Sequence, residues 1–124
     1  MTKPLALIIE DDDDQSYIFS EALKVAEFEI ELFQDGQEAL SRLLTGRRPD
    51  LIILDLHLPT VSGKTILAKV QATTDLIDVP VILTTADPLL ADNLKDEATL
   101  TLLKPISFSQ LRDLAKRVVP SNKN

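Results

Sequence analysis

Acidic side chains follow directly on two apolar runs in this sequence. The run 51–54 leads into Asp55, and the run 5–9 leads into Glu10 and Asp11. Continuous apolar runs of this length are typical of strands buried on both faces of a parallel sheet. Because the carboxyl ends of parallel strands meet at one edge of the sheet, we expect the three carboxylates to lie close together.

A cluster of carboxylates at a sheet edge predicts a metal-assisted phosphoryl chemistry. Neighbouring carboxylates repel, so each resists ionisation unless a cation compensates. A few oxygen ligands with room for water and phosphate oxygens suit Mg²⁺ better than Ca²⁺. Asp55 is then the candidate nucleophile for an aspartyl phosphate, and Lys104 and the Thr85 hydroxyl, at the ends of two further predicted strands, are candidates to contact the phosphoryl oxygens.

Other polar residues near this edge have simpler interpretations. The acids 12–14 are interpreted as solvated charge at a helix N-terminus, and Asp13 or Asp14 as its N-cap. Taken singly, Lys104 also fits a structural ion pair and Thr85 an ordinary strand-end hydroxyl. His57 is the single histidine, and one imidazole among carboxylates does not make a transition-metal centre.

Composition excludes several classes of function. The 124 residues suffice for one domain, and a net charge of −7 argues against binding nucleic acid or an anionic membrane through bulk charge. The absence of cysteine excludes disulfides and thiolate metal sites and fits a reducing cytoplasm, where we expect the protein to act. Since no apolar run reaches about eighteen residues, we expect no membrane span and no signal peptide.

Hydrophobic patterning predicts five strands that alternate with five helices. The predicted strands are 5–9, 29–33, 51–55, 79–85 and 100–103. The predicted helices are about 15–25, one through Ala39 to Leu44, one through Ile66 to Val70, 88–95, and one capped by Ser107 and stopped by Pro120. Strand 29–33 alternates polar and apolar residues, as at a sheet edge. Such repeats build an α/β fold, a doubly wound parallel sheet with helices on both faces.

Four motifs in order make the chain resemble one family. They are Ile-Ile-Glu-Asp-Asp from Ile8, Leu-Asp-Leu-His-Leu-Pro around Asp55 with Ser62-Gly63, Pro-Val-Ile-Leu-Thr-Thr-Ala ending at Ala86, and Lys104-Pro105. From Leu5 to about Val119 the chain is similar to the CheY-like receiver domains of bacterial two-component response regulators, of the stand-alone, single-domain type. The resemblance implies a five-stranded sheet of order 2-1-3-4-5.

The resemblance also implies roles for the residues at this edge. Asp55 would accept a phosphoryl group from a phosphohistidine of a sensor histidine kinase or phosphotransfer protein. Mg²⁺ would be held by Glu10, Asp11, Asp55 and the backbone carbonyl of His57. Thr85 and Lys104 would contact the phosphoryl group, and the Lys104–Pro105 peptide bond is expected to be cis. Such a domain catalyses its own phosphorylation and autodephosphorylation and is not an enzyme in the usual sense.

The sequence departs from the family where many receivers signal. Position 101 is Thr, where receivers usually carry Tyr or Phe, and the stretch from Thr85 to Lys104 is short and lacks the usual glycine. The fourth helix is therefore expected to be short or mobile. Residues 1–119 are predicted to form the receiver domain and 120–124 a polar tail, with no output domain. Output is then expected in trans, through an unknown downstream protein, from a monomer or weak homodimer.

Other functions fit the residues less well. A flavodoxin-like flavin protein needs hydroxyls and glycine after its first strand, where this chain has acids that repel phosphate. A phosphohydrolase of the aspartyl-phosphate kind usually has a second acid two residues after the nucleophile, and here that residue is His57. The alternative that stays open is a phosphorylation-independent interaction module with a receiver-like fold, which needs neither Mg²⁺ nor a phosphoryl group on Asp55.

Overall fold

A computed structural model describes residues 3–119, within which five strands alternate with five helices. The strands are β1 (Leu5–Ile9), β2 (Glu29–Phe33), β3 (Leu51–Asp55), β4 (Val81–Thr85) and β5 (Leu100–Leu103). The helices are α1 (Asp13–Val25), α2 (Gly36–Leu43), α3 (Gly63–Ala72), α4 (Pro88–Asn93) and α5 (Phe108–Val118). All strand pairs are parallel and the order is β2-β1-β3-β4-β5, so the expected fold is confirmed.

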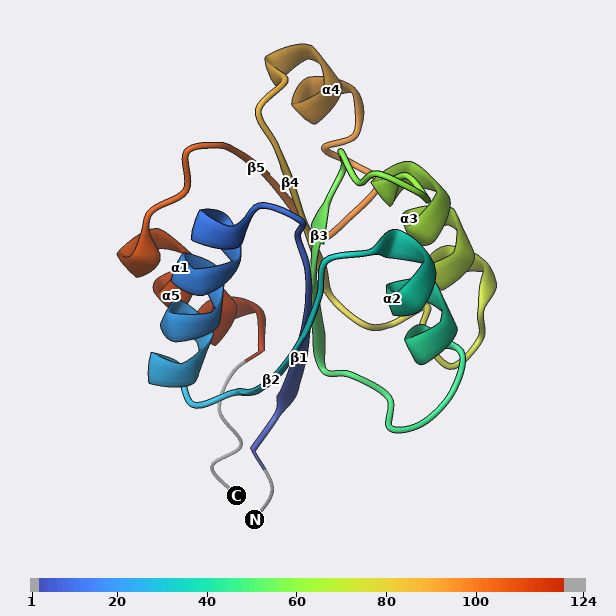
Figure 1. The fold of residues 1–124 in the computed structure, drawn as a ribbon, viewed down its shortest axis with the longest axis horizontal. Coiled ribbons are helices and arrows are strands. Elements are labelled where there is room, and N and C mark those ends of the chain that lie inside the picture. Colours follow the sequence, from blue (N-terminus) through green and yellow to red (C-terminus); the bar gives the residue numbers. More distant parts are fainter. Residues whose placement is uncertain (1–2, 120–124) are drawn as a thin grey trace.

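The helices form a layer on each face of the sheet. Figure 1 shows α1 and α5 on one face and α2 and α3 on the other, while α4 projects beyond the carboxyl ends of the strands. Successive side chains of a strand point to opposite faces, so each strand contributes to two cores. Ile8, Ile53 and Ile82 pack toward α1 and α5, and Leu54 and Leu83 pack toward α2 and α3.

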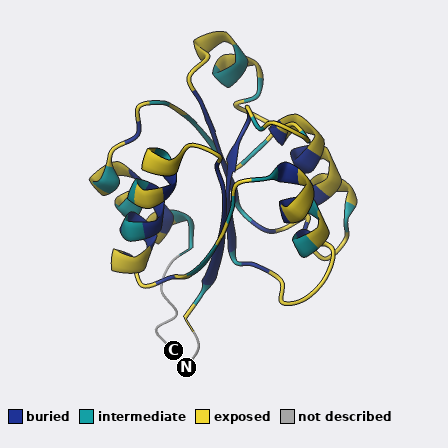
Figure 2. Ribbon diagram, in the orientation of Figure 1, coloured by how far each residue is buried: buried dark blue, intermediate teal, exposed yellow. Residues whose placement is uncertain are grey.

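The three central strands are the most buried part of the molecule. Every residue of β1, β3 and β4 is buried, whereas β2 and β5 at the two edges are only partly so (Figure 2). Each fully buried Leu or Ile contributes roughly 2 kcal/mol through the hydrophobic effect. The ends of β1, β3 and β4 are therefore held by a rigid core.

Helix caps correct one predicted cap residue and confirm another. α1 begins at Asp13, two residues before the predicted start, because the side chain of Asp12 accepts from the N–H groups of Asp14 and Gln15. Asp12 is thus the N-cap, and the prediction of Asp13 or Asp14 was wrong. Ser107 caps α5 as predicted, through the N–H of Gln110.

Two other elements are shorter than predicted. β4 begins at Val81 and not at residue 79, since Pro80 has no N–H for the ladder and contributes only its carbonyl, to Ile52 N at 3.0 Å. α4 ends at Asn93 and not at residue 95, and none of its residues is buried. Its predicted shortness is confirmed. Pro120 and the predicted tail 120–124 lie outside the described residues, and within residues 3–119 no helix is long and apolar enough to span a bilayer.

Candidate functional site

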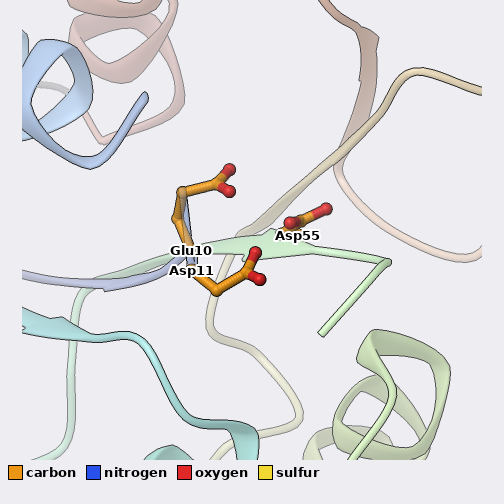
Figure 3. Close-up of side chains that lie close together, drawn as sticks. All are labelled: Glu10, Asp11 and Asp55. Carbon is orange, nitrogen blue, oxygen red and sulfur yellow. The ribbon is translucent and has the colours of Figure 1, made fainter. Parts of the chain in front are cut away.

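Three carboxylates meet at the carboxyl edge of the sheet. Glu10 and Asp11 follow β1, Asp55 ends β3, and one oxygen from each lies within 4.8 Å of the other two. Figure 3 shows the three side chains grouped beside the end of β3. Glu10 and Asp55 are buried, at 1% and 3% exposure, while Asp11 is exposed. Two carboxylates of the cluster are thus buried, and the third is open to solvent.

Hydrogen bonds at the end of β1 fix the position of Glu10. Its N–H donates to Phe33 O at 3.0 Å, so the β1–β2 ladder extends one residue past β1. Its carbonyl accepts from the Ser16 hydroxyl at 2.9 Å, and its Oε2 accepts from Asp12 N at 3.2 Å. The first turn of α1 therefore holds both the backbone and the side chain of this acid.

Lys104 brings a positive charge into the cluster. It follows β5, its N–H donates to Thr85 O at 2.7 Å, and the Lys104–Pro105 peptide bond is cis, as expected. Its Nζ lies 2.9 Å from Glu10 Oε1 and 3.6 Å from Asp55 Oδ2, and its side chain is 18% exposed. One ammonium thus pairs with two buried carboxylates.

Burial changes the protonation of this group of residues. Desolvation, with the charge of Asp55 adding to it, raises the pKa of Glu10 to about 7, although Lys104 and the N–H of Asp12 act in the opposite direction. Burial disfavours the charged form of Lys104, but its contacts with Glu10 and Asp55 outweigh this and raise the pKa of the ammonium. Three carboxylates thus share one ammonium, an arrangement that favours the binding of a cation.

The backbone around Asp55 orients its carboxylate. The N–H of His57 donates to Asp55 Oδ1 at 3.1 Å, which leaves Oδ2 on the side of Lys104. Leu56 N donates to Thr84 O at 3.0 Å and continues the β3–β4 ladder. A Cβ at Gly63 would collide with Asp55 O and would lie 2.6 Å from Leu56 Cα. Only glycine lets α3 begin this close to the end of β3.

Thr85 and His57 form a separate polar pair beside the carboxylates. Thr85 is fully buried, its Oγ1 lies 3.1 Å from His57 Nε2, and it accepts from Asp87 N at 3.1 Å. The hydroxyl therefore has its partners in the two residues that flank the site and not in the carboxylate cluster. Asp87 caps α4 through the N–H groups of Leu89 and Leu90, which links this pair to the fourth helix.

The structure brings Glu10, Asp11, Asp55 and Lys104 together and places Thr85 and His57 next to them. Two residues that contribute to this edge were not singled out from the sequence. The sequence indicates Gly63 only as part of a motif, because its close approach to Asp55 depends on how α3 packs. Thr84 looked like one more residue of a strand, yet it is a buried hydroxyl that pairs with Asp55 in the sheet.

The donor set of this cluster fits a hard divalent cation. Carboxylate oxygens are the ligands that Mg²⁺ prefers, and three of them leave positions for water or phosphate oxygens. Within the described residues no cysteine is present and the one histidine ring faces Thr85, so a soft-metal site does not form here.

The comparisons with known proteins agree on one family. Residues 6–116 match the family described as "Response regulator receiver domain". The chain is similar to the transcriptional regulatory protein PrrA of Mycobacterium tuberculosis, with 32% identity over 114 residues, 90% of this chain and 48% of that protein. It is also similar to the sensor histidine kinase TmoS of Ectopseudomonas mendocina, with 32% identity over 117 residues, 89% of this chain and 11% of that protein.

Solved structures agree with this match. The chemotaxis response regulator CheY4 of Vibrio cholerae superposes with a TM-score of 0.84 at 28% identity, over 94% of this chain and 99% of that one. The chain spans about half of PrrA and about a tenth of TmoS, so the likeness concerns one domain of each. The chain belongs to the family of response regulator receiver domains.

Proposed function

We propose that this domain accepts a phosphoryl group on Asp55 and uses it to regulate a protein interaction. The observation that carries the proposal is the position of Asp55, which is 3% exposed, lies 3.6 Å from the ammonium of Lys104 and shares its space with Glu10 and Asp11. A buried carboxylate beside a cation and a second group of acids is suited to an acyl phosphate.

In the proposed reaction an Asp55 oxygen attacks the phosphorus of a phosphohistidine on a sensor histidine kinase or phosphotransfer protein. The new O–P bond forms as the N–P bond breaks, and the imidazole leaves with that electron pair. The N–H of His57 fixes the orientation of the carboxylate through Oδ1, and Lys104 offsets the charge that the phosphoryl group brings. The Thr85 hydroxyl exchanges its bond with His57 for one with a phosphoryl oxygen.

Glu10, Asp11, Asp55 and the backbone carbonyl of His57 are the proposed ligands of Mg²⁺, which when bound supplies positive charge next to the transferring group. Since Glu10 also pairs with Lys104, cation binding and the position of the lysine are coupled in this proposal.

The proposed output is a change in the surface near Thr85, Asp87 and α4, read by a separate protein. Asp87 connects the buried hydroxyl of Thr85 to the first turn of α4, so a movement of Thr85 reaches this helix. Thr101, at the position of the usual aromatic switch residue, donates to Leu94 O at 3.5 Å and is half-buried. The output here is therefore proposed to depend on Thr85 and α4 and not on an aromatic side chain.

Phosphorylation by a small donor tests this function. Wild type and Asp55→Asn are incubated with acetyl phosphate, with Mg²⁺ or with EDTA, and the intact mass is measured. We expect one added phosphoryl group on wild type with Mg²⁺ and none on Asp55→Asn or with EDTA. An unlabelled wild type, under conditions that label an ordinary receiver, would favour the phosphorylation-independent interaction module, whose partner would bind without regard to Mg²⁺ or phosphate.

A further inference from the structure

Thr84 carries a buried hydroxyl that has no partner. The residue is 0% exposed, and its Oγ1 forms no hydrogen bond within residues 3–119. Buried side-chain polar atoms are bonded in the large majority of cases, because an unpaired one loses its hydration without compensation. A methyl group in the same place would have no such cost, so the hydroxyl requires an explanation other than packing.

The position of Thr84 in the sheet places it at the floor of the site. In the register of the sheet it lies directly between Asp55 on β3 and Leu102 on β5. The alternation of side chains puts Thr84 on the same face as Asp55, the face that Ile53 and Ile82 line further along the strands. Thr84 is thus the neighbour of the phosphoryl acceptor on the side of Lys104.

The side chain of Lys104 has to pass over this position. Lys104 comes two residues after Leu102, and its backbone is fixed to the end of β4. Its Nζ nevertheless lies 3.6 Å from Asp55 Oδ2, at the end of β3. Since neighbouring strands are about 4.8 Å apart, the lysine side chain crosses the end of β4, where Thr84 lies.

The ammonium of Lys104 has a donor to spare. It carries three N–H groups and is in ion-pair contact with two carboxylates, at 2.9 Å from Glu10 Oε1 and 3.6 Å from Asp55 Oδ2, so at least one N–H has no carboxylate to face. Glu10 is in addition a proposed cation ligand, so Lys104 needs another acceptor when a cation is bound. We propose that Thr84 is a positioning residue whose hydroxyl accepts an N–H of Lys104 and holds the ammonium over Asp55 while the phosphoryl group is transferred.

This inference rests on the proposed function of Asp55 and does not involve Thr85, whose hydroxyl is already paired with His57 and Asp87. Rotation about the side-chain bonds of Thr84 and Lys104 makes the new contact without a change in the backbone. The hydroxyl is then unpaired in the resting protein and paired during the reaction.

Three variants separate positioning from packing. Thr84→Val removes the hydroxyl at nearly constant volume, and Thr84→Ser retains it. Thr99→Val is the matched control, because Thr99 Oγ1 accepts from Val81 N at 3.2 Å, at the opposite end of β4. For each variant we would measure the thermal midpoint in EDTA and the rate of phosphorylation by acetyl phosphate at saturating Mg²⁺.

We expect opposite patterns for the two valine variants. Thr84→Val should melt at or above the temperature of wild type but should be phosphorylated about ten-fold more slowly, the factor for one hydrogen bond to a charged group. Thr84→Ser should regain most of the rate. Thr99→Val should melt at a lower temperature and be phosphorylated at the rate of wild type.

The reactivity of Lys104 provides a readout that does not depend on turnover. With Mg²⁺ bound, Thr84→Val should increase the rate at which an amine-specific reagent modifies Lys104, relative to the exposed Lys95 in the same sample. A Thr84→Val protein with the phosphorylation rate and the Lys104 reactivity of wild type would overturn the role of Thr84. So would a slow Thr84→Val that Thr84→Ser does not rescue, because that result indicates packing. A wild type that takes up no phosphate would instead refute the function of Asp55, and the role of Thr84 with it.

Discussion

Glu10 is a carboxylic acid whose protonation the fold changes. It has the side chain of an ordinary acid, but at 1% exposure and beside Asp55 its pKa is raised to about 7. Among residues 3–119, its ionic partner is Lys104, whose Nζ lies 2.9 Å from Glu10 Oε1. The two residues together set how much negative charge the site holds before a cation or a phosphoryl group arrives.

The raised pKa of Glu10 predicts how stability depends on pH. Between pH 4.5, the ordinary value of the group, and about 7 the folded protein binds more protons at Glu10 than the unfolded chain does. The free energy of unfolding therefore falls as the pH rises through this window. We would measure the free energy of unfolding in urea with EDTA. Between pH 5 and pH 8, this free energy should rise by about 2 kcal/mol for Glu10→Gln relative to wild type. The control Glu38→Gln, at an exposed position, should show no such rise. If the free energy of unfolding had the same pH dependence in wild type and Glu10→Gln, the account would be contradicted.

Lys104 should be necessary for stability as well as for chemistry. Lys104→Met leaves two buried carboxylates without their cation, which costs on the order of 3 kcal/mol at pH 8 in the absence of Mg²⁺. The loss should shrink at pH 5, where Glu10 is protonated. Lys95→Met is the matched control, since Lys95 pairs with Asp92 on the solvent-exposed surface. It should change the free energy of unfolding by less than about 0.5 kcal/mol. Equal effects of the two substitutions would show that the buried pair contributes no more than an exposed one.

Among the elements, α3 and α4 affect the site in different ways. α3 begins at Gly63 against the backbone of Asp55 and Leu56, so its position and that of the acceptor are linked. α4 has six residues and no buried side chain, and only its cap residue Asp87 connects it to the buried Thr85. α3 therefore packs directly against the backbone of Asp55, whereas α4 reaches the core only through partly buried side chains such as Leu90.

Gly63→Ala tests the support from α3. Its Cβ would meet backbone atoms, which do not yield as a flexible side chain does, so the helix must move away from β3 at a cost of about 2 kcal/mol. We expect slower phosphorylation of Asp55 by acetyl phosphate together with the loss of stability. Gly46→Ala is the control, because Gly46 has a φ of +78° in the exposed turn between α2 and the start of β3, at the end of that strand opposite Asp55. This variant should lose stability without slower phosphorylation. If both variants were phosphorylated at the rate of wild type, the support from α3 would not matter for the reaction.

The weak attachment of α4 predicts fast amide exchange. The N–H groups of Ala91 and of the C-cap Leu94 donate to α4 carbonyls or its cap at 3.0 and 3.1 Å, but the helix has no fully buried side chain and contacts the core only through the partly buried Leu90 and Leu94. They should exchange with deuterium at least about ten-fold faster than the amides around Leu111 and Ala115, which α5 buries against the sheet. Protection of α4 equal to that of α5 would contradict the expectation of a mobile fourth helix.

At the scale of the whole molecule, the sequence predicted the architecture well because strand burial leaves a strong pattern. The continuous apolar runs of β1 and β3 identify parallel strands, and the topology then brings Glu10, Asp11, Asp55 and Lys104 to one edge. Helix starts were less certain, since a run of acids offers several caps and only the folded backbone selects Asp12. The bond between Thr85 and His57 and the unpaired hydroxyl of Thr84 were not predictable, because they depend on side-chain directions that a pattern does not encode.

The central claim is that Asp55, and no neighbouring acid, receives the phosphoryl group. The most direct measurement is to phosphorylate the protein with acetyl phosphate and Mg²⁺, reduce the acyl phosphate with borohydride and locate the resulting homoserine by peptide mass spectrometry. The account predicts homoserine at position 55 alone, and its absence when EDTA replaces Mg²⁺. Reduction product at Asp11 or Asp12, or at no position in a protein that ordinary receiver conditions should label, would contradict it.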